Sequence, residues 1–167
     1  MKNKVFLSFI VATTLSCVRD KQPIKIEIAS EFPKKEVTHI DVYSFVENRP
    51  CKQDKAISII YKGKLDTSCF TYLKTIDQKQ SQVLCNELLS PKTYGSFGHS
   101  CFDTDYALLL YNHKDVVIGY VNLSLGCLWS SGEPKIPAEA NSYIDGEPAP
   151  ALTKYGESTI RKLLGVK

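Results

Sequence analysis

The stretch of sequence that decides the fold runs from Cys101 to Cys127 and reads CFDTDYALLLYNHKDVVIGYVNLSLGC. Two runs rich in aliphatic and aromatic residues, 106–111 and 116–125, lie on either side of the polar turn 112–115. Two such runs around a short turn predict a β-hairpin.

The two cysteines of this stretch lie at the open end of the predicted hairpin. If Tyr111 faces Val116, residue 126 lies opposite Cys101, and Cys127 is one position away. A slip or bulge of one residue places the two thiols within disulfide distance. We therefore expect a disulfide between Cys101 and Cys127.

The N-terminus has the pattern of an export signal. A short basic stretch, 1–4, precedes an apolar run of eleven residues, 5–15, which is too short to span a bilayer as a helix. The run ends at Ser16-Cys17, which resembles a bacterial lipoprotein cleavage site, although Thr14 stands where leucine is usual. We expect residues 1–16 to be a signal peptide and Cys17 to carry a lipid. The alternative is an ordinary signal peptide in which Cys17 is incidental.

The expected mature chain has an almost balanced charge. The net charge of +3 includes Lys2 and Lys4, and without them 19 basic residues stand against 18 acidic residues. This balance gives no electrostatic reason to expect nucleic acid or an anionic membrane surface as a partner. We expect a tether over 17–23, a single domain over 24–167, and a location in the cell envelope, on a membrane facing the periplasm or the cell surface.

Five cysteines remain if Cys17 is lipidated, and disulfides persist outside the cytoplasm. Because five is odd, at least one thiol is free or pairs between chains. The pairing among Cys51, Cys69 and Cys85 stays open, and a buried helical thiol is one interpretation of Cys85.

Alternating and apolar segments predict a mainly antiparallel sheet of about six strands. Before the hairpin, strands are expected over 24–28, 37–46, 56–61 and 65–73, with a tight turn at Lys62-Gly63 between the last two. Together with two helices and the disulfide-stapled hairpin, these strands define an α+β fold.

The first helix is expected over 78–89, with Asp77 as its N-cap and Val83, Leu84 and Leu88 on one face. The proline-rich segment 133–150 is expected to be irregular. The second helix follows and should cover one face of the sheet before Gly165 ends it. Its apolar stripe comprises Leu152, Tyr155, Ile160, Leu163 and Leu164.

This order of elements resembles a family of small exported proteins and lipoproteins of Gram-negative bacteria. The resemblance covers 78–129 and rests on Cys101-Phe102, the run 107–110 ending in Tyr111, and the strand that closes at Cys127. It implies the fold and export, and it implies no activity. The segment 103–105 stands where the family has proline and arginine, so no role of that arginine is carried over.

His99, Cys101, Asp103 and Asp105 are spaced closely enough to suggest a nucleophile or a metal site. A disulfide-bonded Cys101 has no thiolate, and the closely spaced Cys and His pairs of metal sites are absent from the sequence. We therefore assign no catalytic residue, metal ligand or cofactor. A Cys/His-dependent envelope enzyme is kept as an alternative.

The leading interpretation is a non-catalytic, lipid-anchored envelope protein that binds another macromolecule, with a protein as the expected partner. An immunity or inhibitor protein is one concrete form. Core packing of the aromatic residues and a small-ligand site near Tyr94 and Trp129 are the alternatives, and the oligomeric state is not predicted. The candidate partner-binding residues are Tyr94, Phe97, His99, Asp103, Asp105 and Trp129.

Overall fold

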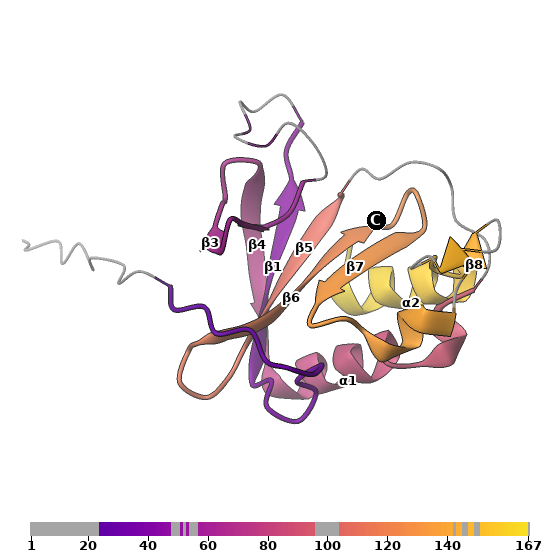
Figure 1. Cartoon of the computed structure of the whole chain (residues 1–167), viewed down its shortest axis with the longest axis horizontal. Helices are drawn as coiled ribbons and strands as arrows, with labels where there is room; N and C mark the ends of the chain where they lie inside the picture. The colour runs from indigo at the N-terminus through magenta and orange to yellow at the C-terminus, as the bar shows by residue number, and fades with distance from the viewer. Residues whose placement is uncertain are drawn as a thin grey trace, which may run out of the picture.

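The structure is a computed structural model, and it describes residues 24–47, 51, 53, 57–95, 104–141, 143–144, 147–148 and 151–166. Its centre is a five-stranded antiparallel sheet in the order β4-β1-β5-β6-β7 (Figure 1). The strands are β1 (His39–Phe45), β4 (Phe70–Ile76), β5 (Tyr106–Tyr111), β6 (Val117–Ser124) and β7 (Trp129–Glu133). With helices α1 (Gln78–Leu88) and α2 (Lys154–Leu164), they confirm the predicted α+β fold.

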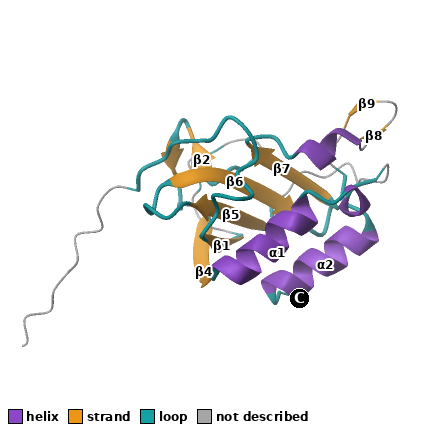
Figure 2. Cartoon of the chain, turned by 90° about the horizontal axis from the view of Figure 1, so that it is seen from below, coloured by secondary structure: helices purple, strands orange, loops and turns teal. Residues whose placement is uncertain are grey.

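Both helices lie on the same face of the sheet, as Figure 2 shows. Strand residues of alternating position point toward them, because successive side chains of a strand lie on opposite faces. This confirms that the last helix covers the sheet. The helix-facing core includes Ile40 and Val42 of β1, Leu108 and Leu110 of β5, Leu84 and Leu88 of α1, and Ile160 and Leu164 of α2.

The outer face of the sheet, which is the face opposite the helices, has a second and smaller core. A short hairpin of β2 (Ile60–Tyr61) and β3 (Lys64–Leu65) packs against part of it. The disulfide Cys51–Cys69 holds this covering segment, with a Cα–Cα distance of 5.1 Å. The buried members of this core are Tyr43, Ile59, Cys69, Phe70, Ala107, Leu109, Tyr111 and Val117.

The predicted hairpin is present, but its register differs from the expected one. Tyr111 faces Val117 and not Val116, and an irregularity follows at Leu110. The reason lies in the turn, because Asn112 pairs with Val116 through a 3.1 Å backbone hydrogen bond and Asp115 adopts φ 55°. A three-residue loop ending in a left-handed residue is a common hairpin connection, and here it shifts the pairing of Tyr111 by one position. The irregularity adds a second position, so Leu110 faces Gly119.

Three other strand predictions needed correction. Of the segment 56–61, the described residues form a strand only at Ile60–Tyr61. The segment 65–73 is not one strand, because Asp66 accepts a 3.0 Å hydrogen bond from the backbone of Ser68 and starts a turn between β3 and β4. The segment 24–28 is extended but forms one parallel bridge, from Ile26 to Val117. The turn at Lys62-Gly63 is confirmed by φ values of 51° and 73°.

Strand β7 is an element that the sequence did not predict. It pairs with β6 from Ser124↔Trp129 to Tyr120↔Glu133. The proline-rich segment after it contains a short helix, η2 (Pro137–Asn141), and two short strands, β8 (Tyr143–Ile144) and β9 (Glu147–Pro148).

The start of α1 and the end of α2 lie where their capping residues predict, whereas α1 ends at Leu88, one residue earlier than expected. The Asp77 carboxylate accepts a 2.8 Å hydrogen bond from the backbone N–H of Gln80, and Gly165 ends α2 at φ 62°. The apolar stripes were partly wrong, because Val83 is 47% exposed and Tyr155 is 53% exposed. Ser81 and Cys85 take buried places on α1 instead.

A short helix, η1 (Pro91–Thr93), follows α1 and contacts the start of α2. In the part of the chain that the structure describes, no helix is long and apolar enough to cross a membrane.

Candidate functional site

Two of the predicted contact residues are built into the fold. Tyr94 pairs with Leu152 and Trp129 pairs with Ala151, each through an isolated antiparallel bridge. Tyr94 is 5% exposed, and burial raises the pKa of its hydroxyl. Its ring packs in the core, which is the alternative that the sequence left open, and Trp129 is half-buried.

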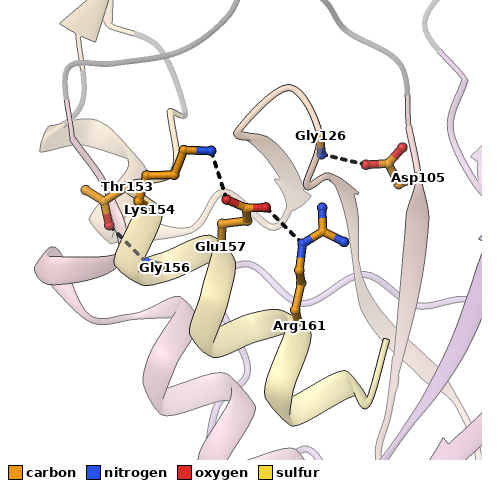
Figure 3. A network of polar contacts seen from close by, with 7 residues as sticks. All are labelled: Asp105, Gly126, Thr153, Lys154, Gly156, Glu157 and Arg161. Atoms are coloured by element: carbon orange, nitrogen blue, oxygen red, sulfur yellow. Dashed lines mark hydrogen bonds and ion pairs between the residues drawn. The ribbon is translucent and has the colours of Figure 1, made fainter. Parts of the chain in front are cut away.

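Asp105 lies at the end of the hairpin, beside helix α2. Its Oδ2 accepts a 2.9 Å hydrogen bond from the backbone N–H of Gly126. Figure 3 shows this pair near Arg161, whose Nε donates a 2.9 Å hydrogen bond to Glu157. These groups border a crevice of about 410 Å³, which is lined by Ser44, Phe45, Glu47, Asp105, Tyr106, Gly126 and Arg161.

Five of the predicted site residues, Cys17, Phe97, His99, Cys101 and Asp103, lie outside the described residues. Cys127 is disulfide-bonded. Because Cys101 is not among the described residues, the pairing of Cys101 with Cys127 stays a prediction.

Of the three cysteines left open by the sequence, two are paired and one is free. Cys51 and Cys69 form a disulfide, and Cys85 is a free thiol buried in α1. Burial raises the pKa of the Cys85 thiol to about 12, so it stays protonated at neutral pH. Within the described ranges, no group of three His, Cys, Asp or Glu side chains could hold a metal ion.

The outer face of the sheet carries a group of polar and aromatic side chains that the sequence analysis did not assign. On β1, His39, Asp41 and Tyr43 alternate and therefore share this face. Their cross-strand partners are Tyr111 of β5, opposite His39, and Thr75 and Tyr72 of β4, opposite Asp41 and Tyr43. We name these six residues the tyrosine cluster.

A β-bulge in β4 makes the cluster possible. In a regular strand, Tyr72 and Thr75 would lie on opposite faces, because they are three positions apart. The register of β4 shifts between Val42 and Tyr43, which leaves Leu73 as the extra residue. Both Tyr72 and Thr75 therefore lie on the outer face, beside β1.

The cluster consists of two ring pairs with a carboxylate between them along β1. The rings of His39 and Tyr111 stack at a centroid distance of 4.6 Å, with an interplanar angle of 6°. The rings of Tyr43 and Tyr72 meet edge to face at 5.7 Å.

Thr75 links the carboxylate to the outermost tyrosine. Its hydroxyl donates a hydrogen bond to Oδ1 of Asp41, and it lies 2.9 Å from the hydroxyl of Tyr72. Asp41 is half-buried, whereas Thr75 and Tyr72 are exposed. Solvent therefore reaches the cluster on the side of the edge strand β4.

The carboxylate of Asp41 gives the cluster a negative charge that no described cation pairs with. Burial raises the pKa of Tyr43 to about 12, and the charge of Asp41 adds to the effect. The pKa of Tyr111 is also raised, by burial and then by the charge of Asp41. Among the described residues, no lysine, arginine or histidine forms an ion pair with Asp41.

A second hollow, of about 1060 Å³, lies on the molecule between the segment 28–36 and the segment 133–137, with Leu89 at its border. It is open, and its rim includes Lys34, Lys35 and Glu133. No polar group of the tyrosine cluster lines it, so the two features are separate.

The alternation of His39, Asp41 and Tyr43 was the available sequence signal for the cluster. It was not sufficient, because the partners from β4 and β5 depend on strand order and on the bulge at Leu73.

Comparison of the chain with protein-family models, with curated proteins and with solved structures gave no match.

Proposed function

We propose that this chain is a non-catalytic, lipid-anchored protein of the cell envelope, and that it binds a protein partner through the tyrosine cluster. The N-terminal pattern, with its basic stretch, apolar run and Ser16-Cys17, supports export and lipidation. An immunity or inhibitor protein is one form that such a binding protein takes.

The observation that carries the proposal is the exposure of Tyr72 on a strand that is paired within the sheet. Tyr72 is 51% exposed, and Leu73 beside it is 44% exposed, both on the edge strand β4. Tyrosine is a frequent interface residue, because it offers a large contact area and a hydroxyl at a small cost in conformational entropy. Positions on paired strands hold such a side chain more firmly than loop positions do.

The chemistry of the described residues favours binding over catalysis. Asp41 accepts a hydrogen bond from Thr75, and the Cys85 thiol is buried and protonated. Neither group has the arrangement of a nucleophile with an adjacent base.

Two exposed tyrosines on opposite sides of the sheet make a matched test. Tyr72 is 51% exposed on β4, and Tyr155 is 53% exposed on α2. Detergent-extracted envelopes from cells producing the wild type, Tyr72→Ala or Tyr155→Ala would be separated by size under native conditions. The wild type and Tyr155→Ala should elute in a complex, and Tyr72→Ala should elute as the free chain.

The same material tests the lipid. Intact-mass measurement should show a chain beginning at Cys17 with an acyl adduct. Co-elution of all three variants at the size of the free chain would contradict partner binding, and an unmodified Cys17 would contradict lipidation.

A further inference from the structure

The charge and the aromatic rings of the tyrosine cluster indicate the chemistry of the group that it binds. We infer that it receives an arginine side chain of the protein partner, with the guanidinium seated on Asp41 between the two ring pairs. This inference rests on the proposed function and names what the partner contributes to the same site.

The first argument is charge complementarity. The described part of the chain supplies no cation to Asp41, although it pairs Glu27 with Lys25 and Glu157 with Lys154 and Arg161. Asp41 is nevertheless half-buried among rings, where a charge interacts more strongly than in bulk water. A cation from outside the chain would compensate this charge.

The second argument is hydrogen-bonding capacity. An ionised carboxylate accepts about four hydrogen bonds through its two oxygens. Asp41 accepts one from Thr75. The remaining capacity suits a donor with two parallel N–H groups, which is the geometry of a guanidinium.

The third argument is the aromatic surround, which favours arginine over lysine. The guanidinium is planar, weakly hydrated and stacks on aromatic rings, whereas an ammonium is compact and strongly hydrated. Rings lie on both sides of Asp41 along β1, with His39 and Tyr111 on one side and Tyr43 and Tyr72 on the other. The exposed face of Thr75 and Tyr72 provides the approach.

The test uses N-acetyl-arginine-amide as the probe and N-acetyl-citrulline-amide as a neutral probe of the same shape. The full chain, labelled with ¹³C on its tyrosine rings and threonine methyl groups, would be titrated with each probe at low salt and followed by NMR. Tetramethylammonium would serve as a cation that cannot donate hydrogen bonds. The variants are Asp41→Asn, which keeps the shape, and Glu36→Gln, which removes an exposed carboxylate elsewhere.

The arginine probe should shift the signals of Tyr43, Tyr72, Tyr111 and Thr75 with one dissociation constant, in the millimolar range expected for a single side chain. Affinity for it should fall about tenfold in Asp41→Asn and stay unchanged in Glu36→Gln. The citrulline probe should bind at least about tenfold more weakly. Circular dichroism would show that Asp41→Asn is folded.

Equal shifts with the citrulline probe, or an unchanged affinity in Asp41→Asn, would overturn the inference. Equal binding of tetramethylammonium would also overturn it, because it would indicate a general cation site such as one for a choline headgroup. These outcomes are separate from the test of partner binding. If Tyr72→Ala loses the complex but the arginine probe does not bind, the inference about arginine is refuted and the proposal that the cluster binds a partner is retained.

Discussion

Asp41 of β1 and Thr75 of β4 are paired on adjacent strands, and the threonine hydroxyl donates a hydrogen bond to the carboxylate. Thr75 reaches this position because β4 carries a bulge at Leu73. The edge strand is thereby fixed to the central strand at the point where Tyr72 is exposed. We expect this link to hold the orientation of the partner-binding face.

The first prediction concerns the charge of Asp41. In Asp41→Asn, the pKa of Tyr43 should fall from about 12 but stay above 10.0, because burial is the larger cause and remains. Removing a neighbouring negative charge makes the phenolate easier to form, which sets the direction. A pH titration of ¹³C-labelled tyrosine rings measures it. Asp115→Asn is the control, since Asp115 acts on Tyr111 and not on Tyr43.

The second prediction is a dependence of stability on pH. Glu139 is partly buried and accepts a 2.9 Å hydrogen bond from Ser130, and burial raises its pKa from 4.5 to about 7. The pKa of Glu139 is higher in the folded state than in the unfolded state. The contribution of its carboxyl group to stability is therefore fully present below pH 4.5 and is lost as the pH rises through 7. We expect the free energy of unfolding to fall by at most about 3 kcal/mol across this window.

Glu139→Gln isolates this effect, because the amide has the same shape and does not titrate. Urea denaturation at several pH values should show a smaller loss of stability between pH 4.5 and 8 in this variant than in the wild type. Identical pH profiles would show that Glu139 is not the cause.

The third prediction concerns the close approach of α2 to η1. A Cβ on Gly156 would overlap the carbonyl oxygen of Thr93 and lie 2.9 Å from its Cγ2. Gly156→Ala should therefore cost about 3 kcal/mol of unfolding free energy, because backbone atoms must move. In Gly126→Ala the nearest atom would be Oδ2 of Asp105, at 3.7 Å, so this control should cost less than about 1 kcal/mol.

The fourth prediction concerns the disulfide that holds the cover of the outer face. Cys51 and Cys69 are separated by 18 positions. Replacing both by serine should cost about 3 kcal/mol, because the unfolded chain loses a constraint on a loop of this length. Cys85→Ala, which removes a buried thiol without a crosslink, should cost less. Equal losses for the two variants in urea denaturation would contradict a stabilising role of the crosslink.

The sequence predicted the elements that depend on neighbouring residues. The central hairpin, the caps at Asp77 and Gly165, and the turn at Lys62-Gly63 follow from local patterns and were confirmed. The register of the hairpin does not follow from these patterns, because it depends on whether Asn112 belongs to the turn or to the paired strand.

The tyrosine cluster could not be predicted from local patterns either, because its residues are distant from one another in the sequence. Asp41 and Thr75 are 34 positions apart, and their contact depends on β4 lying beside β1 and on the bulge at Leu73. Tyr94 illustrates the same dependence on long-range pairing. The sequence left both a contact role and core packing open for it, and its pairing with Leu152 decides for the core.

Site-specific photo-cross-linking tests the central claim most directly. Benzoylphenylalanine would replace Tyr72 in one chain and Tyr155 in another, since the two side chains are almost equally exposed on opposite sides of the sheet. Irradiation of intact envelopes should give one discrete protein adduct from position 72 and none from position 155. The same adducts from both positions, or none from either, would contradict a partner-binding role of the outer face.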